Sequence, residues 1–426
     1  MIRKVFRLLS EVRKNPYFGF IQGHEHLSLE DLAEIQKWVG SDNLEIIEEF
    51  EQRFAEIIGD GQTVSFAAGR MGFYALMQVL GIQAGDEVVL QGATCSVMVN
   101  AVLRNGATPV YADIDPETFG SSEAAIEKVL SPKTKMVVAQ HSFGIPCDIQ
   151  PIVELTQMKG VFLLEDCALT LGSSINEVVC GNFGDAALFS TDHSKPLNTL
   201  TGGFIYTKDS ELFKKIKKVQ SKSGSLSVKK QKKLWSQLLF ERKYTSPDRY
   251  GRMQLLSMLR AKFKCTTHPF LDEDFGIGSS TSYPYPAKIP TFLAALGMFE
   301  LERWERTAKK RKELFQLLLK IIDEDSKKEL PYVYFDSSRN IVPLRMVWAP
   351  ENGTAVRSKL AKFVSTSWTW FMEPIIATSE PLDKFGYKEG CCPISEKIGS
   401  RMVNIPCNLP SKWVGVLQHN LESSEI

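Results

Sequence analysis

Three short segments of the sequence place polar or charged residues at the end of an apolar run. Gly69 follows TVSFAA, Glu165 and Asp166 end VFLLED, and Ser190 and Lys195 come after AALF. Taken singly, each segment has an ordinary explanation, because a glycine often makes a turn, an acid often caps a helix and a lysine is often a solvated charge. Their combination is more informative than any one of them.

Together these residues carry the chemical groups that a pyridoxal phosphate site needs. The aldehyde of that cofactor requires a lysine amine, its ring nitrogen requires a carboxylate, and its phosphate requires N–H and hydroxyl donors. Lys195 supplies the amine, Asp166 the carboxylate, and Gly69 with Ser190 the phosphate donors, Gly69 at the start of a predicted helix. A glycine pair at 202–203 would let the next strand pass close to this site.

The segments lie in a region where short apolar runs alternate with amphipathic stretches. The apolar runs that predict strands are TVSFAA, DEVVLQG, TPVYADI, KMVVAQH, VFLLEDC, AALFSTD and GGFIYTK. Helices are predicted between them over residues 70–80, 97–104, 122–129 and 149–158. This alternation predicts an α/β fold with a mostly parallel sheet covered by helices. Ligands of such sheets bind beyond the carboxyl ends of the strands, where the residues above are expected.

The chain is predicted to have three parts. Residues 1–62 form an N-terminal helical segment, with two helices over 28–58 that begin at a capping box. Residues 63–285 form the large cofactor-binding domain. Residues 286–426 contain a linking helix over 290–322 and a smaller α+β domain, in which VYFDS and IVPLRMVWA predict strands and AVRSKLAKFV predicts a helix.

A basic insert interrupts the large domain at residues 208–264. It holds 17 Lys/Arg against 4 Asp/Glu, and its segments LWSQLLF and MQLLSMLRAKF predict helices with one apolar face. We favour a helical hairpin whose charges face water. The alternative is a surface that contacts anionic lipid through the lysines at 229, 230, 232 and 233, directly before LWSQLLF.

Composition narrows the class of protein. The 51 Lys/Arg and 50 Asp/Glu residues give a net charge of +1, so there is no overall attraction to nucleic acid. No stretch approaches the roughly 18 apolar residues of a spanning helix, and the charged start MIRKVFRLLSEVRKN is unlike a signal peptide, so we expect a cytoplasmic protein. The eight cysteines and six histidines are dispersed, and we expect neither a disulfide framework nor a metal site.

The motifs and their order resemble the DegT/DnrJ/EryC1/StrS family of fold type I aminotransferases, which depend on pyridoxal phosphate. This resemblance implies a homodimer that transfers an amino group, expected from glutamate, to a keto sugar attached to a nucleotide. It also implies a role in the synthesis of amino sugars, cell-surface polysaccharides or secondary metabolites. The resemblance runs from about residue 27 to 406 and rests on GIQAGDEVVLQGATC, NGATPVYADIDPET, TKMVVAQHSFGIPCDI, LLEDCALTLG, GDAALFSTDHSKPLNTLTGG, LAALGMFELERWERTAKKR and CCPISEKIGSRMVNIP.

Five positions take expected roles from this resemblance. Lys195 resembles the lysine that holds the cofactor, Asp166 the partner of its ring nitrogen, and Ser190 a phosphate ligand. Gly69 and Arg70 fall where the phosphate loop of the family usually has Gly-Thr, and the guanidinium of Arg70 can reach a phosphate or a substrate carboxylate.

Four other positions depart from the family pattern. Cys95 is a candidate cofactor contact, although an aromatic ring usually stacks on the cofactor at this position. Leu169 replaces the usual Gln or His. Pro286 and Lys288 replace Asn and Arg in the segment that helps to form the site across the dimer interface, which makes Lys288 the candidate substrate-binding residue.

Two histidines accompany these residues. His141 ends the strand KMVVAQH, matches a histidine of the family and is a candidate catalytic residue, with a structural hydrogen bond as the alternative. His193 lies two residues before Lys195, and we expect it only to shape the loop.

Two alternative functions are open. A pyridoxal-phosphate-dependent sugar deoxygenase of the same group carries His in place of the cofactor lysine, and Lys195 argues against it. A non-catalytic protein that keeps the fold and binds a sugar nucleotide or a partner is suggested by Cys95, Leu169 and Pro286. The retention of Lys195 together with Asp166 and Ser190 favours an enzyme.

Overall fold

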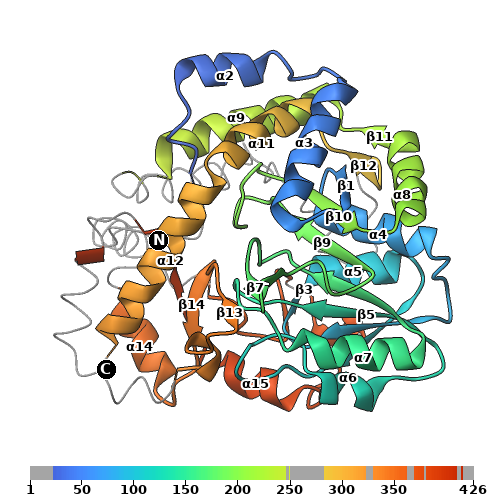
Figure 1. Ribbon diagram of the computed structural model, residues 1–426, viewed down its shortest axis with the longest axis vertical. Coiled ribbons are helices and arrows are strands. Elements are labelled where there is room, and N and C mark those ends of the chain that lie inside the picture. The colour runs from blue at the N-terminus through green and yellow to red at the C-terminus, as the bar shows by residue number, and fades with distance from the viewer. Residues whose placement is uncertain are drawn as a thin grey trace, which may run out of the picture.

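A seven-stranded sheet forms the centre of the structure (Figure 1). The computed structural model describes residues 23–245, 249, 283–322, 330–361, 369–378, 380–409 and 414–415. In spatial order the strands are β1 (Gln62–Phe66), β10 (Gly203–Thr207), β9 (Ala186–Ser190), β6 (Phe162–Asp166), β5 (Thr134–Gln140), β2 (Glu87–Gln91) and β4 (Thr108–Ala112). β10 is antiparallel to β1 and β9, and the other neighbouring pairs are parallel. The expected α/β fold with a mostly parallel sheet is confirmed.

The direction of β10 positions the loop that carries Lys195. Because β10 returns antiparallel beside β9, the connection over 191–202 begins and ends at the same edge of the sheet. The amide of Thr191 donates to the carbonyl of Gly202, and the amide of Thr199 donates to the carbonyl of Thr191. The loop is therefore closed at its base, directly beyond the carboxyl end of β9.

Helices cover both faces of the sheet. Alternate residues of β2 point to the helices on opposite faces of the sheet. Val88 and Leu90 pack in the same core as α4 and α5, whereas Val89 packs with α6 and α7. Strands covered on both faces are apolar throughout, which is why continuous apolar runs predicted them correctly. The covering helices are α4 (Gly69–Val79), α5 (Ser96–Arg104), α6 (Glu123–Val129), α7 (Ile149–Lys159) and α8 (Ser210–Lys222).

Two N-terminal helices, α2 (Leu29–Gln36) and α3 (Leu44–Ile58), pack against the long helix α11 (Thr291–Glu302). The predicted capping box is present, with Ser28 and Asp31 exchanging hydrogen bonds. α3 packs closely against α11 because Gly297 of α11 has no side chain. A Cβ at this position would lie 2.2 Å from the ring of Phe50 of α3.

The predicted linking helix is two helices, α11 and α12 (Trp304–Ile321), separated at Arg303. At the break, the Arg303 guanidinium contacts Glu300 and the ring of His26. The predicted strand VYFDS is wrong, because a 3-10 turn, η2 (Tyr332–Tyr334), occupies its first residues. The Tyr334 hydroxyl bonds the backbone of Val347, so a tertiary contact replaces strand pairing at this point.

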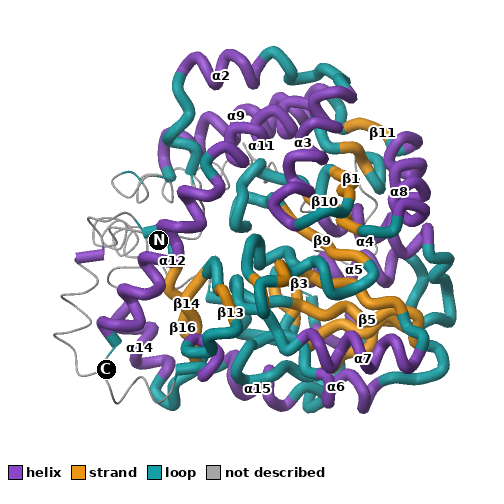
Figure 2. The backbone as a smooth tube through the Cα atoms, in the orientation of Figure 1, coloured by secondary structure: helices purple, strands orange, loops and turns teal. Residues whose placement is uncertain are grey.

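The C-terminal part lies beside the sheet domain (Figure 2). Its apolar core is shared with residues of that domain, among them Phe143 and Leu169. A two-residue strand, β15 (Ile375–Ile376), pairs in parallel with β3 (Thr94–Cys95), which joins this part to the large sheet domain. The proposed domain limits stay a prediction. The remaining elements are β14 (Arg345–Trp348) paired with β16 (Val403–Pro406), β7 (Ser174–Ile175), β8 (Val178–Val179), β13 (Arg339–Asn340), α14 (Gly353–Leu360), η3 (Leu382–Phe385) and α15 (Pro393–Gly399).

The first part of the basic insert forms α8, the short strand β11 (Gly224–Ser225) and α9 (Val228–Tyr244). β11 pairs with β12 (Ala287–Lys288). On α9, Leu234 and Leu238 are buried, whereas Lys229, Lys232 and Lys233 are exposed. The lysine at 230 places its Nζ 4.4 Å from the ring centre of Tyr283. The second predicted helix, MQLLSMLRAKF, lies outside the described residues. Among the described helices, none is both long and apolar enough to cross a membrane.

The packing of α9 predicts that its exposed residues Lys229 and Lys232 are solvated. The double variant Lys229→Glu, Lys232→Glu keeps Lys230 and its ring contact, so each change should alter the free energy of unfolding by no more than about 0.5 kcal/mol. We expect neither the wild type nor the variant to cosediment with anionic vesicles at low salt. Strong binding of the wild type that the variant loses would establish a lipid surface instead.

Candidate active site

A cavity of about 530 Å³ lies at the carboxyl ends of β5, β6 and β9. Its wall combines the start of α4, the loop after β9 and two segments of the C-terminal part. The residues that line it are 68–70, 94–95, 97–98, 140, 166, 168–169, 188, 190, 192–195, 201–202, 369–371 and 376–377. Of the predicted site residues, the structure brings six to this cavity: Gly69, Arg70, Cys95, Asp166, Ser190 and Lys195.

Lys195 lies in the cavity wall with its Nζ 4.9 Å from the ring centre of Trp370. Burial lowers the pKa of this amine below its ordinary value, although the charges of Asp192 and Asp166 act in the opposite direction. A lysine with a lowered pKa has a larger fraction of neutral amine, which is the form that attacks carbonyl groups and accepts protons.

Asp166 ends β6 and is 4% exposed. Its Oδ1 accepts a hydrogen bond of 2.9 Å from the amide of Ala168, and within the described residues its Oδ2 accepts none. Burial raises the pKa of this carboxyl, while the Ala168 amide and the charge of Lys195 lower it. Asp166 is therefore a buried acid with an acceptor available to a cationic group in the cavity.

The neighbouring acid, Glu165, is fully buried and is already saturated with hydrogen bonds. Its two oxygens accept from the amides of Gly181, Phe183 and Gly184, each at 2.7 Å. Its Oε2 also lies 3.0 Å from His141 Nε2. Successive residues of a strand point to opposite faces, which separates Glu165 from the cavity that Asp166 lines.

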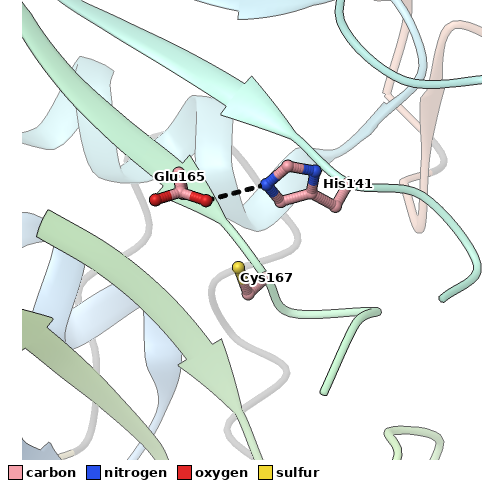
Figure 3. A group of neighbouring side chains, drawn as sticks. All are labelled: His141, Glu165 and Cys167. Atoms are coloured by element: carbon pink, nitrogen blue, oxygen red, sulfur yellow. Dashed lines mark hydrogen bonds and ion pairs between the residues drawn. The ribbon is translucent and has the colours of Figure 1, made fainter. Parts of the chain in front are cut away.

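His141 does not line the cavity, which differs from the catalytic role expected from the sequence. Its Nδ1 accepts a hydrogen bond of 3.1 Å from the amide of Cys147, so this nitrogen carries no proton. The Nε2 nitrogen then carries the proton and donates it to Glu165 (Figure 3). Both ring nitrogens are thus occupied, and the contacts of His141 are those of a residue that supports Glu165 beneath the site.

His141, Glu165 and Cys167 place three atoms of metal-ligating types within 4.8 Å of one another (Figure 3). The hydrogen bonds of Glu165 and His141 account for this grouping. A metal ion would have to displace several of those bonds in a fully buried position, so we assign none to the cluster.

The other end of the cavity is formed by the start of α4 and the end of β9. Gly69 opens α4, Arg70 follows it, and Ser190 is the last residue of β9. The first N–H groups of a helix have no partner inside the helix and favour an anion. The strand β10 passes so close to this turn that a Cβ on Gly203 would lie 2.4 Å from the Gly69 Cα, which requires glycine at position 203.

Cys95 and Leu169 line the cavity, whereas Lys288 does not line it within its own chain. Burial raises the pKa of the Cys95 thiol, so this residue contributes a neutral sulfur to the wall. Lys288 lies in β12, and the carbonyl of the preceding Ala287 accepts from the amide of Ala67, near the start of α4.

Sequence reasoning missed Trp370, Phe371 and Gln140 among the lining residues. Two basic side chains contact the ring of Trp370: the Arg345 guanidinium lies 4.2 Å from its centre and Lys195 Nζ lies 4.9 Å from it. The one available signal was the run SWTWF, which holds three aromatic residues in five. Because this run lies far from Lys195 along the chain, the sequence did not reveal the contact between Trp370 and Lys195.

Comparisons with known proteins point to one family. The sequence profile of the DegT/DnrJ/EryC1/StrS aminotransferase family matches residues 25–410. The GDP-perosamine synthase of Escherichia coli O157:H7 is 36% identical over 176 residues, which cover 41% of this chain and 48% of that protein. The chain spans about half the length of the curated relatives it matches.

Solved structures share the fold at low sequence identity. An aminotransferase from Psychrobacter cryohalolentis has a TM-score of 0.70 and 18% identity, covering 92% of this chain and 95% of that one. NtdA from Bacillus subtilis, solved with bound cofactor PMP, has a TM-score of 0.68 and 18% identity, covering 95% of this chain and 84% of that one. With the profile match over most of its length, the chain belongs to the DegT/DnrJ/EryC1/StrS aminotransferase family.

Proposed function

We propose that this protein is a pyridoxal-phosphate-dependent aminotransferase that transfers an amino group from glutamate to a keto sugar attached to a nucleotide. The observation that carries the proposal is that the Lys195 amine and the Asp166 carboxylate line one cavity. The relative GDP-perosamine synthase, named for a nucleotide-linked sugar, supports the substrate class. Assembly as a homodimer and a cytoplasmic location stay predictions.

The cavity meets the chemical requirements of the cofactor at three points. Lys195 offers an amine of lowered pKa for the aldehyde. Asp166 offers an acceptor oxygen, without a hydrogen bond from the described residues, for the ring nitrogen. Arg70, the Ser190 hydroxyl and the amides at the start of α4 are the groups that would hold the phosphate.

When bound, pyridoxal phosphate would withdraw electrons from the substrate carbon that loses a proton. The carboxylate of Asp166 would strengthen this effect by keeping the ring nitrogen protonated. The Nζ of Lys195 would take up the proton and return it, since its lowered pKa favours the neutral base. Trp370 and Phe371 supply an apolar wall that limits water around the amine.

We propose that Lys288 contributes to substrate binding through the partner subunit of a homodimer. In its own chain Lys288 does not line the cavity, yet β12 contacts the segment that begins α4. The departures at Cys95 and Leu169 lie in the cavity wall, so they bear on which substrate fits. A non-catalytic binding protein, the alternative, would take up no cofactor.

The variant Lys195→Ala should lose both the visible absorbance of the cofactor complex and all turnover, because no other lysine lines the cavity among the described residues. Borohydride treatment of the wild type should fix the cofactor to the peptide that contains Lys195, as detected by mass spectrometry. The exposed Lys222 on α8 provides the control, since Lys222→Ala should behave as the wild type. Turnover by Lys195→Ala near the wild-type rate, or a colourless wild type, would contradict the assignment.

The variant Asp166→Asn should bind the cofactor but lose activity on the order of 10²-fold, equivalent to roughly 3 kcal/mol of barrier, because the amide cannot hold the ring nitrogen protonated. The turnover rate constant under saturating substrate measures this. Asp185→Asn is a matched control, since Asp185 accepts from the Leu163 amide near the start of β6 and away from the cavity. A loss below about fivefold in Asp166→Asn would indicate a structural cap instead.

A further inference from the structure

Gln140 ends β5 and lines the cavity next to Asp166. The two residues are register partners on the neighbouring parallel strands β5 and β6. Such strands lie roughly 4.8 Å apart, and paired residues point to the same face of the sheet. The side chains of Gln140 and Asp166 therefore lie side by side in the cavity wall.

The amide group of Gln140 is held in one orientation through its nitrogen. Nε2 donates to the carbonyl of Ala93 at 3.1 Å and to the Ser142 hydroxyl at 2.9 Å. A backbone carbonyl can only accept, so turning the amide over would set its oxygen against the oxygen of Ala93. Because both N–H groups are used in these bonds, Oε1 is the atom that Gln140 offers to a ligand.

Neighbouring polar residues outside the cavity wall hold this arrangement in place. Gln91 Nε2 donates to the same Ala93 carbonyl at 2.9 Å. The Ser121 hydroxyl donates to Gln91 Oε1 at 3.2 Å and accepts from the backbone amide of Gln140 at 2.9 Å. The position of Gln140 is thus fixed by its backbone as well as by its side chain.

The oxygen of Gln140 is a buried acceptor. Gln140 is 5% exposed, and within the described residues its Oε1 accepts no hydrogen bond. The Oδ2 of Asp166 is in the same condition. A buried acceptor that has no donor costs free energy, so it is satisfied by a donor that enters the cavity. Two such oxygens on neighbouring strands suit a cationic N–H group, whose positive charge both of them favour.

We propose that Gln140 is a further cofactor-binding residue, whose Oε1 accepts together with Asp166 from the protonated ring nitrogen of pyridoxal phosphate. The identity of the ligand rests on the proposed function, whereas the pair of acceptors does not. One N–H can be shared by two acceptors in a three-centre hydrogen bond. The carbonyl dipole of Gln140 would favour the protonated ring without adding a second buried charge beside Asp166.

The test compares two cofactors that differ at the ring nitrogen. 1-Deazapyridoxal 5′-phosphate keeps the aldehyde and the phosphate but has C–H in place of this nitrogen, so it lacks the donor. Absorbance titration of the purified full chain measures the dissociation constant of each compound.

The variants separate the oxygen of Gln140 from its structural contacts. Gln140→Met keeps the length of the side chain without the amide, and Gln140→Glu keeps an acceptor oxygen. Gln140→Leu, which also lacks the amide, replaces Gln140→Met if the circular dichroism of the latter shows that it does not fold. The control is Gln231→Met, because Gln231 is a buried glutamine on α9 whose amide bonds Gly40 and Leu226 outside the cavity wall.

We expect Gln140→Met to bind pyridoxal phosphate about tenfold more weakly than the wild type, because a hydrogen bond to a charged group is lost. Its affinity for the deaza analogue should change far less. Gln140→Glu should keep the wild-type preference for pyridoxal phosphate over the analogue, since a carboxyl oxygen also accepts. Gln231→Met should bind both compounds as the wild type does.

Equal losses of affinity for the two compounds in Gln140→Met would overturn the proposal, because a residue that only supports Ala93 would weaken both alike. Unchanged binding of pyridoxal phosphate by Gln140→Met, or loss of the preference in Gln140→Glu, would also overturn it. A wild type that takes up no pyridoxal phosphate would contradict this proposal and the proposed function together. The expected affinities without transamination would refute the proposed function alone.

Discussion

Burial of Lys195 and Asp166 around one cavity is the constraint on which the site depends. Removal from water lowers the pKa of the amine and raises that of the acid, so both side chains are driven toward their neutral forms. The protein sets the balance with nearby charges and dipoles, among them the Ala168 amide, Asp192 and Arg345. Because these groups belong to different elements, the chemistry of the cavity depends on the whole sheet edge being assembled.

The pleat of β6 gives two adjacent acids different tasks. Glu165 points away from the cavity and uses its charge to fix the turn at 181–184 through three amides, with His141 as a further support. Asp166 points into the cavity and keeps one oxygen without a hydrogen bond from the described residues. An exchange of these roles would require a one-residue shift of register, which would also reverse every side chain of the strand.

Much of the fold and the local part of the site could be predicted from the sequence. Strands covered on both faces are continuous apolar runs. Asp166 and Ser190 end two of these strands, and Lys195 lies in the loop that follows Ser190. The features that the sequence did not predict depend on contacts between segments that are far apart along the chain. Nothing local to VYFDS reveals the hydrogen bonds of Tyr334 with Val347, and the contact between His193 and Glu241 joins residues 48 positions apart. Family resemblance placed His141 near the cofactor, but its hydrogen-bond partners became visible only in three dimensions.

The most direct test of the central claim, that Lys195 and Asp166 act on one cofactor in this cavity, is a crystal structure of the protein grown with pyridoxal phosphate. We predict continuous electron density from Lys195 Nζ to the cofactor, the ring nitrogen within hydrogen-bond distance of Asp166, and the phosphate at Gly69 and Ser190. A cofactor bound elsewhere, or a cavity in which saturating pyridoxal phosphate leaves no density, would contradict it.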